Sequence, residues 1–305
     1  MRKAFSDALV RIACTNRRTL LLTGDHGYAL FDAFRRECPE QYINVGIAEQ
    51  NMVGVAAGLA RAGFRPFVYG LSSFVPVRVV EQIKIDVARD DLPVVFVGDG
   101  AGFVYSHLGT SHQSTEDIAC TRAIPHLSVL SPGDRFELTM CMDTAYRAKS
   151  PVYLRMGKAD LGDVHAGPVV AGIGELLQIR EGEPDGVSLF ATGSMLRTAM
   201  EIIDAAMPRL GLWSVPSIKP INASQVAEIC GRSKILVTLE EHSVFGGLGS
   251  LIAELSSAVA PRPLLRIGVA DRFSAHCGTY QYLRSEHGLD SESIQRRISE
   301  FVANF

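Results

Sequence analysis

The sequence predicts an α/β fold made of two doubly wound domains. Short β-branched and aliphatic runs alternate with amphipathic segments, a pattern typical of parallel sheets flanked by helices. The chain has 305 residues, enough for two domains of ordinary size. A glycine-rich segment without helical periodicity, at 157–174, separates the two halves. We therefore expect a first domain at 1–160, a linker at 161–180 and a smaller second domain at 181–305.

In the first half, the expected strands are short apolar runs that end at turn residues. Gly24-Asp25 closes the first run, and Asp90-Asp91 makes the turn before the fourth. Gly63 is well placed as the C-terminal cap of a helix that begins at Glu49. The expected strands are 19–23, 42–45, 65–69, 92–98, 127–130 and 151–155, and the expected helices are 49–62 and 74–89.

The second half repeats this alternation on a smaller scale. Its expected strands are 187–190, 211–214, 234–239 and 264–267, and its expected helices are 194–207, 222–230 and 245–257. The same order of strand and helix again favours a parallel sheet covered by helices.

Composition excludes several classes of protein. The chain is 47% hydrophobic and 21% charged with a net charge of −3, so no basic field indicates nucleic-acid binding. Its six cysteines include no C-x-x-C pair, which argues against a zinc or dithiol site, and scattered thiols suit a reducing cytosol. Neither a signal peptide nor an apolar run of membrane-spanning length is present. We expect a cytoplasmic protein that binds neither nucleic acid nor membrane.

Glu49 stands out because it begins a helix that is otherwise rich in small and apolar residues. One interpretation is a first-turn acid that the helix dipole favours. The other is a buried acid with a raised pKa, suited to exchanging a proton with a heterocycle. The residues alone leave both interpretations open.

The segment Gly46-Ile47-Ala48-Glu49-Gln50, followed by an Ala/Gly-rich helix, resembles the pyrimidine-binding domain of the transketolase family. The resemblance implies thiamine diphosphate as the cofactor, with Glu49 as a catalytic residue bonded to the N1′ atom of the aminopyrimidine ring. That contact favours the tautomer that removes the proton from C2 of the thiazolium. The cofactor supplies the difficult chemistry, and the protein supplies orientation and a dry pocket.

A second matching segment spans residues 69–83. Phe74 could be an ordinary core aromatic at the start of a helix. In the family, an aromatic at this position stacks on the aminopyrimidine, and further aromatics follow where this chain has Val77 and Val80. The resemblance thus implies a more aliphatic ring pocket, and its expected cofactor-binding residues are Ile47, Glu49, Phe74, Val77 and Gln82.

A third match is the loop Gly109-Thr110-Ser111-His112-Gln113. A lone loop histidine is more often a surface residue, but the family histidine faces the substrate hydroxyls. The resemblance therefore makes His112 a catalytic candidate for proton transfer. Leu108 stands where the family has an acidic residue that selects hydroxyl stereochemistry, so sugar specificity does not carry over.

Two arginines occupy positions at which the family binds the substrate phosphate, Arg2 and Arg155. The alternative for Arg155, at a strand end near a linker, is domain packing. Two other contacts of the family are replaced by Ala29 and Gly98. Side chains that could fill the vacated space are His26, Arg78 and His107, and the expected substrate-binding set is Arg2, His26, His107, His112 and Arg155.

The turn Gly98-Asp99-Gly100 imitates the start of the diphosphate-Mg²⁺ motif of thiamine enzymes. That motif needs a later Asn, because Mg²⁺ takes several oxygen ligands, and the chain has none between Asn51 and Asn222. We therefore expect no metal site in this chain. The Mg²⁺ and the diphosphate should be held by a partner, an N-terminal transketolase subunit, in an α2β2 heterotetramer.

The predicted function is transfer of a two-carbon ketol unit from a ketose, expected to be phosphorylated, to an aldose. The β subunit of a 2-oxoacid dehydrogenase-type decarboxylase has the same two domains and remains an alternative. A non-catalytic scaffold homologue is another, although a degenerate copy has no physical reason to keep a buried acid. A 1-deoxyxylulose-5-phosphate synthase is disfavoured, because its Asp-Arg-Ala-Gly segment is Asp99-Gly100-Ala101-Gly102 here.

Overall fold

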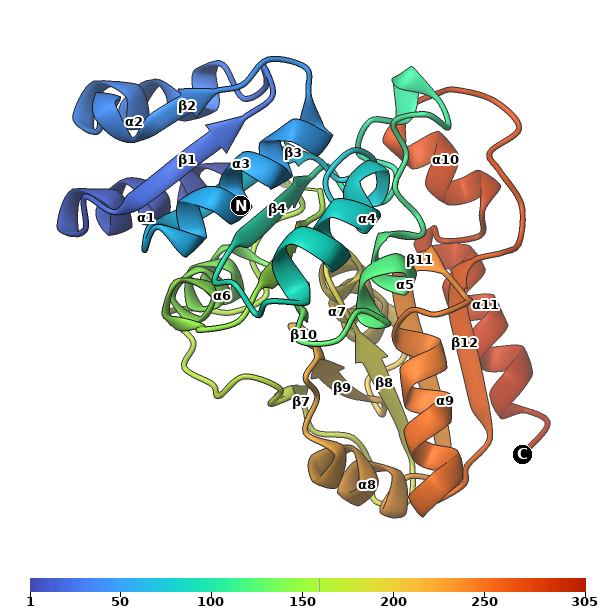
Figure 1. Cartoon of the computed structure of the whole chain (residues 1–305). Coiled ribbons are helices and arrows are strands. Elements are labelled where there is room, and N and C mark those ends of the chain that lie inside the picture. Colours follow the sequence, from blue (N-terminus) through green and yellow to red (C-terminus); the bar gives the residue numbers. More distant parts are fainter. Residues whose placement is uncertain (159) are drawn as a thin grey trace.

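The computed structural model describes residues 1–158 and 160–305. It shows two α/β domains, the first in the upper left of Figure 1 and the second in the lower right, each built on a mostly parallel sheet. Helices pack on both faces of each sheet. The predicted fold class of two doubly wound domains is therefore confirmed.

The first sheet contains, within the described residues, the strands β1 (Thr19–Thr23), β2 (Tyr42–Asn44), β3 (Arg65–Leu71), β4 (Val95–Asp99), β5 (Ser128–Leu130), β6 (Val152–Met156) and β10 (Ser217–Lys219). Their order is β10-β5-β6-β4-β3-β1-β2. Neighbours pair in parallel except β10, which runs antiparallel to β5. Because β10 comes from the second half of the chain, the first sheet is completed across the predicted domain boundary.

The helices of the first domain form two layers. They are α1 (Arg2–Thr15), α2 (Asp32–Glu37), α3 (Glu49–Arg61), α4 (Val80–Gln82), α5 (Asp117–Arg122) and α6 (Arg135–Arg147), with the short 3₁₀ helices η1 (Ala29–Phe31), η2 (Pro39–Gln41), η3 (Val77–Val79) and η5 (Ser106–Leu108) and the π-helix η4 (Ile83–Ala88). Apolar residues of α1, α2 and α6 share one core with the sheet. Those of α3, η3, η4 and α5 form the core on the other face.

The helix predicted at 74–89 differs from the structure in its start. It begins at Val77 and is divided into η3, α4 and η4, while residues 72–76 form a turn. Pro76 explains the late start, because proline lacks an N–H group and disfavours helical geometry in the residue before it. Phe74 therefore lies on a turn directly after β3.

The second sheet contains, among the described residues, β7 (Leu177–Arg180), β8 (Val187–Ala191), β9 (Gly211–Ser214), β11 (Ile235–Ser243) and β12 (Leu264–Val269). Their order is β12-β11-β8-β9-β7, with β7 antiparallel to β9. β7 thus lies inside the segment 161–180 that was predicted to be linker. The helices are α7 (Met195–Ala206), α8 (Ala223–Gly231), α9 (Leu248–Val259), α10 (Tyr280–Glu286) and α11 (Ser291–Val302).

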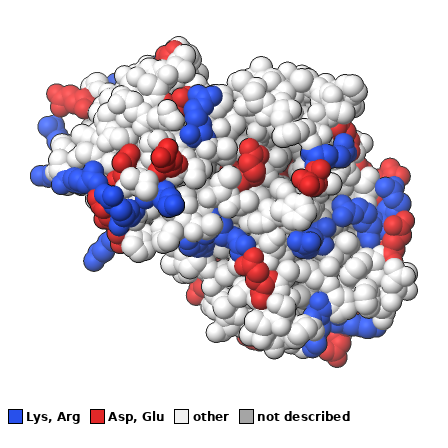
Figure 2. Space-filling model, turned by 45° about the vertical axis from the view of Figure 1, so that its right-hand side comes forward, with Lys and Arg blue, Asp and Glu red and all other residues white. Residues whose placement is uncertain are grey.

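The two domains share a continuous apolar core. Residues of α8 and α9 belong to the same buried cluster as residues of α3 and η4. On the face shown in Figure 2, positive and negative side chains are interspersed. Within the described residues, no helix has the length and apolar character needed to cross a membrane.

Candidate functional site

The predicted site residues gather at one edge of the first sheet. β2, β1, β3 and β4 are neighbours in the sheet and run in parallel. The segments that follow their carboxyl ends carry Glu49, His26, Phe74 and His112 respectively. The carboxyl edge of a parallel sheet is the usual position of a ligand site in doubly wound folds.

Glu49 is the first residue of α3 and is only 5% exposed. Its Oε2 atom accepts a hydrogen bond of 2.9 Å from Nη1 of Arg78. Its Oε1 atom is buried and has no hydrogen-bond partner among the described residues. Such an atom is costly to leave unpaired, so it is a natural acceptor for an N–H group of a bound ligand.

The Phe74 ring is the centre of a compact group of side chains. The guanidinium carbon of Arg78 lies 4.0 Å from the Phe74 ring centroid. The rings of His112 and His26 lie 5.3 and 6.2 Å from it, both in edge-to-face geometry. Glu49 contacts Arg78, Arg78 contacts Phe74, and Phe74 contacts His112. The structure therefore connects the two predicted catalytic residues, Glu49 and His112.

The other residues predicted to contact the ring or the substrate have more varied surroundings. Ile47 is 74% exposed, two residues before Glu49. Val77 is half-buried in η3, and Oε1 of Gln82 is buried without a hydrogen-bond partner within the described chain. His107 is exposed on η5. The predicted roles of these four residues stay predictions.

Arg2 is half-exposed and pairs with Asp99, with 3.1 Å between Nη2 and Oδ2. Tyr69 and Tyr105 donate hydrogen bonds to the same carboxylate oxygen, at 2.8 and 3.2 Å. Partial burial disfavours the charge of Arg2, but Asp99 outweighs it and the pKa of Arg2 is raised. The apparent metal-motif residue Asp99 thus balances Arg2 in this structure, and the guanidinium keeps its charge.

Arg155 lies in the interior, between the two domains. It is 1% exposed, its Nε donates to Asp117 at 2.8 Å, and its Nη2 donates to the carbonyl of Glu241 in the second domain at 2.8 Å. Tyr153 also donates to Asp117, at 2.6 Å. Burial disfavours the charge of Arg155, but Asp117 raises its pKa. These contacts favour the alternative, a domain-packing residue, and the phosphate-binding role of Arg155 stays a prediction.

Sequence reasoning missed the ion pair between Arg78 and Glu49. It named Arg78 only as a side chain that could occupy vacated space and assigned it no direction. The available signal was its position four residues after Phe74, which places the long side chain within reach of the same ring once the turn is formed. Local sequence does not reveal that turn, so the pair follows only from the fold.

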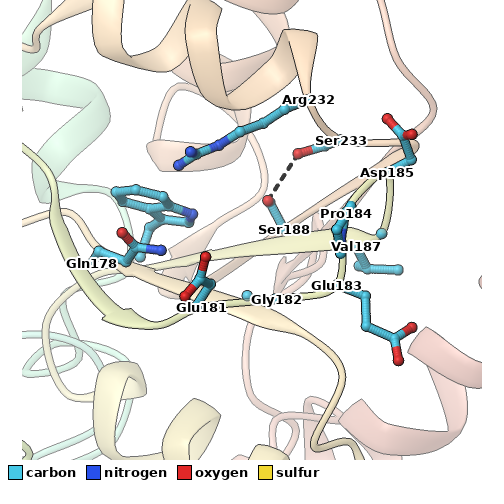
Figure 3. Close-up of a pocket in the computed structure, with 13 residues that line it drawn as sticks. Gln178, Glu181, Gly182, Glu183, Pro184, Asp185, Val187, Ser188, Arg232 and Ser233 are labelled. Carbon is cyan, nitrogen blue, oxygen red and sulfur yellow. Dashed lines mark hydrogen bonds between the residues drawn. The ribbon is translucent and has the colours of Figure 1, made fainter.

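A pocket of about 260 Å³ lies in the second domain, lined by residues of β7, β8 and the loop between them (Figure 3). The Arg232 guanidinium stacks 5.1 Å from the Trp213 ring, and Ser233 donates to Ser188 at 2.8 Å. These four side chains thus already contact one another in pairs. The pocket therefore offers less to a ligand than the Glu49 site.

Comparison with known protein families shows the family to which this chain belongs. The family model described as the transketolase pyrimidine binding domain matches residues 1–163, and the transketolase C-terminal domain matches residues 174–294. The chain belongs to the transketolase family. Membership of this family implies dependence on thiamine diphosphate and a transferase type of enzyme.

Several transketolase-family relatives match almost the whole chain. A putative transketolase C-terminal section of Methanocaldococcus jannaschii is 36% identical over 98% of this chain and 95% of that protein. One of the subunits of an apulose-4-phosphate transketolase from Phocaeicola vulgatus is 30% identical over 99% and 97%. A solved structure of a split gene transketolase, an inactive β4 tetramer, has a TM-score of 0.89 and 30% identity, covering 99% of this chain and 97% of that one.

Longer members of the transketolase family match this chain with only part of their length. A 1-deoxy-D-xylulose-5-phosphate synthase of Chlorobium luteolum is 34% identical over 97% of this chain but 48% of that protein. A transketolase of Pichia stipitis has a TM-score of 0.82 at 18% identity, and the match covers 46% of its chain. The second likeness concerns the fold alone.

Proposed function

We propose that this chain is the pyrimidine-binding subunit of a two-chain transketolase that moves a two-carbon ketol unit from a ketose to an aldose. The observation that carries the proposal is the buried Oε1 of Glu49, which has no hydrogen-bond partner among the described residues, on a side chain that Arg78 links to the Phe74 ring. That pair suits a flat heterocycle with an N–H group, which is the chemistry of the thiamine aminopyrimidine. The names of the M. jannaschii and P. vulgatus relatives support a subunit role.

Bound thiamine diphosphate would supply the carbon nucleophile that attacks the ketose carbonyl. Glu49 holds a proton at the ring nitrogen, and Phe74 stacks on the ring. Ile47, Val77 and Gln82 complete the surroundings of the ring. The His112 ring lies 5.3 Å from the Phe74 ring, where it would donate to or accept from substrate hydroxyls.

The diphosphate and Mg²⁺ are proposed to be held by an N-terminal transketolase subunit in an α2β2 assembly. Among the described residues, no group of three or more His, Cys, Asp or Glu side chains is arranged to hold a metal ion. Ile47, 74% exposed beside Glu49, is available to contact such a partner. The names of the relatives, as a C-terminal section or as one of several subunits, support this division of the site.

The proposed donor is a phosphorylated ketose outside central metabolism. Arg2 is the anchor for its anion, since Arg155 is buried between domains. Two relatives are named as subunits of an apulose-4-phosphate transketolase, which favours a phosphorylated and uncommon sugar.

Co-expression with the candidate partner and a ketol-transfer assay over a panel of ketose phosphates tests the proposal. Decarboxylation of a 2-oxoacid without ketol transfer would instead establish the decarboxylase alternative.

The division of the site predicts that the isolated chain binds thiamine diphosphate poorly. Calorimetry with Mg²⁺ should detect no binding at micromolar concentrations, whereas the complex with the partner should bind. Affinity of the lone chain at about 1 μM or tighter, roughly −8 kcal/mol, would contradict a divided site.

Arg78 occupies the face of Phe74 that the cofactor ring is proposed to take. Arg78→Ala should therefore tighten cofactor binding by the complex by up to about fivefold, because an ion pair of at most ~1 kcal/mol no longer has to be broken. Fluorescence titration with thiamine diphosphate measures the change.

The matched control for this prediction is Arg61→Ala, which removes a similarly half-exposed arginine paired with Asp90. Cofactor affinity should be unchanged in that variant. Weaker binding in Arg78→Ala would show that Arg78 is a ligand of the cofactor and not an occupant that it displaces.

A further inference from the structure

The loop that carries His112 is held at both ends by the second domain. At its start, Gly109 has a positive φ of 77°, and a Cβ there would lie 3.1 Å from Sγ of Cys277. At its end, Gln113 is 6% exposed and its Oε1 accepts a hydrogen bond of 2.9 Å from Oγ of Ser274. The preceding turn η5 contacts α10, which follows this segment (Figure 1). The segment after β12 that contains Ser274 and Cys277 thus contacts both ends of the loop 109–113.

The hydrogen bonds behind Gln113 have a defined direction. A serine hydroxyl has a single proton, so Ser274 donates to Gln113 and accepts from Nε2 of His287, 3.0 Å away. Nδ1 of His287 is buried without a partner in the described chain, as suits the neutral Nε2–H tautomer. Burial, and after it the charge of Arg272, lowers the pKa of His287 and keeps it neutral.

The same histidine is fixed by the first domain. Its ring stacks on Phe103 with 4.8 Å between centroids and 20° between planes. Phe103 follows Gly102, which exchanges two backbone hydrogen bonds with Ser114, at 2.7 and 3.0 Å, and so closes the base of the loop. Phe103, Gln113, Ser274 and His287 also line a small cavity of about 40 Å³. The hydrogen bond from Ser274 is the printed side-chain contact of Gln113 at this cavity.

We propose that Ser274 and His287 are positioning residues that hold the loop 109–113 so that His112 faces Phe74. The second domain would then contribute to the geometry of the active site as well as to assembly. The role of His112 in this inference rests on the proposed function. The hydrogen bond from Ser274 to Gln113 does not depend on the proposed function, and a measurement independent of catalysis tests it below.

Ser274→Ala removes the donor to Gln113 without touching Glu49, Phe74 or His112. In the complex with the partner, kcat should fall about 10- to 100-fold, the range expected when a reacting group is slightly misplaced. Thiamine diphosphate affinity should stay within about twofold of wild type, because the ring contacts are intact. Ser274→Thr keeps the hydroxyl and should restore most of kcat. Ser257→Ala, an exposed serine on α9, is the control and should match wild type.

Two changes at His287 separate the hydrogen bond from the ring stack. His287→Phe keeps an aromatic on Phe103 but loses the donor, so it should reproduce the loss of Ser274→Ala. His287→Gln keeps an N–H near the same place and should recover part of kcat. If His287→Phe behaves as wild type while His287→Gln does not, the stack matters and the hydrogen-bond relay is refuted.

Hydrogen exchange of the amides at 109–115 reports the loop directly, independently of catalysis. Ser274→Ala and His287→Phe should speed this exchange at least about fivefold, while exchange in α3 stays unchanged. If the wild-type complex shows no ketol transfer, the proposed function fails. Hydrogen exchange of the loop amides then tests the positioning role of Ser274 and His287 by itself. If exchange and kcat are both unchanged in Ser274→Ala, the positioning role is overturned. If Ser274→Ala does not fold, His287→Phe decides by the same two readouts.

Discussion

Replacing Glu49 by glutamine should lower ketol transfer by roughly 10²-fold or more at saturating cofactor, as expected for loss of a general acid. The amide keeps the size of the carboxylate, so Phe74 and α3 keep their positions. It cannot hold or release a proton at the ring nitrogen, however. Steady-state kinetics of the complex with its partner measures the effect, and circular dichroism verifies the fold.

The control for this change is Glu81→Gln, an exposed acid in α4 on the same side of the sheet, which should leave turnover unchanged. Near-normal turnover of Glu49→Gln at saturating cofactor would remove Glu49 from the mechanism. A defect that high cofactor concentrations fully repair would assign Glu49 to binding alone.

Replacing Arg155 by alanine should destabilise the chain by about 3–5 kcal/mol, the usual cost of removing one partner of a buried ion pair. Asp117, which is fully buried, would keep only the hydrogen bond from Tyr153, and the carbonyl of Glu241 would lose its donor. Urea unfolding should show a lower midpoint with a similar slope.

A double variant tests the cause of the Arg155 effect. If the cost comes from an unpaired buried carboxylate, Arg155→Ala with Asp117→Asn should be less destabilised than the sum of the single changes. Arg11→Ala removes an exposed ion pair with Asp143 and should cost no more than about 1 kcal/mol. Unchanged stability of Arg155→Ala, together with a raised KM for phosphorylated ketoses only, would restore the anion-binding role.

Much of the local structure could be predicted because short-range patterns dictate it. The apolar run 19–23 forms β1 with the predicted bounds, and the helix expected at 49–62 ends at Arg61, one residue early. The same local logic placed Glu49 at the start of α3. The grouping of Glu49, Phe74 and His112 was expected only from the family resemblance, and the structure places all three after the carboxyl ends of neighbouring parallel strands.

Other features depend on contacts that no local pattern contains. β10 pairs with β5 although about ninety residues separate them in the sequence, and β7 joins a sheet from within a predicted linker. Arg155 was predicted to bind an anion from its position in the family motif, and only tertiary structure shows Asp117 and the Glu241 carbonyl around its guanidinium.

By itself, the sequence determined the two-domain α/β architecture and the family resemblance that singled out Glu49, Phe74 and His112. Tertiary structure alone decided which charges are free and which are paired. It paired Arg78 with Glu49 and Asp99 with Arg2. It also hydrogen-bonded Ser274 to Gln113, which are 161 positions apart in the chain. The physical reason is that backbone periodicity follows from neighbouring residues, whereas the pairing of polar side chains follows from how the packed elements bring distant residues together.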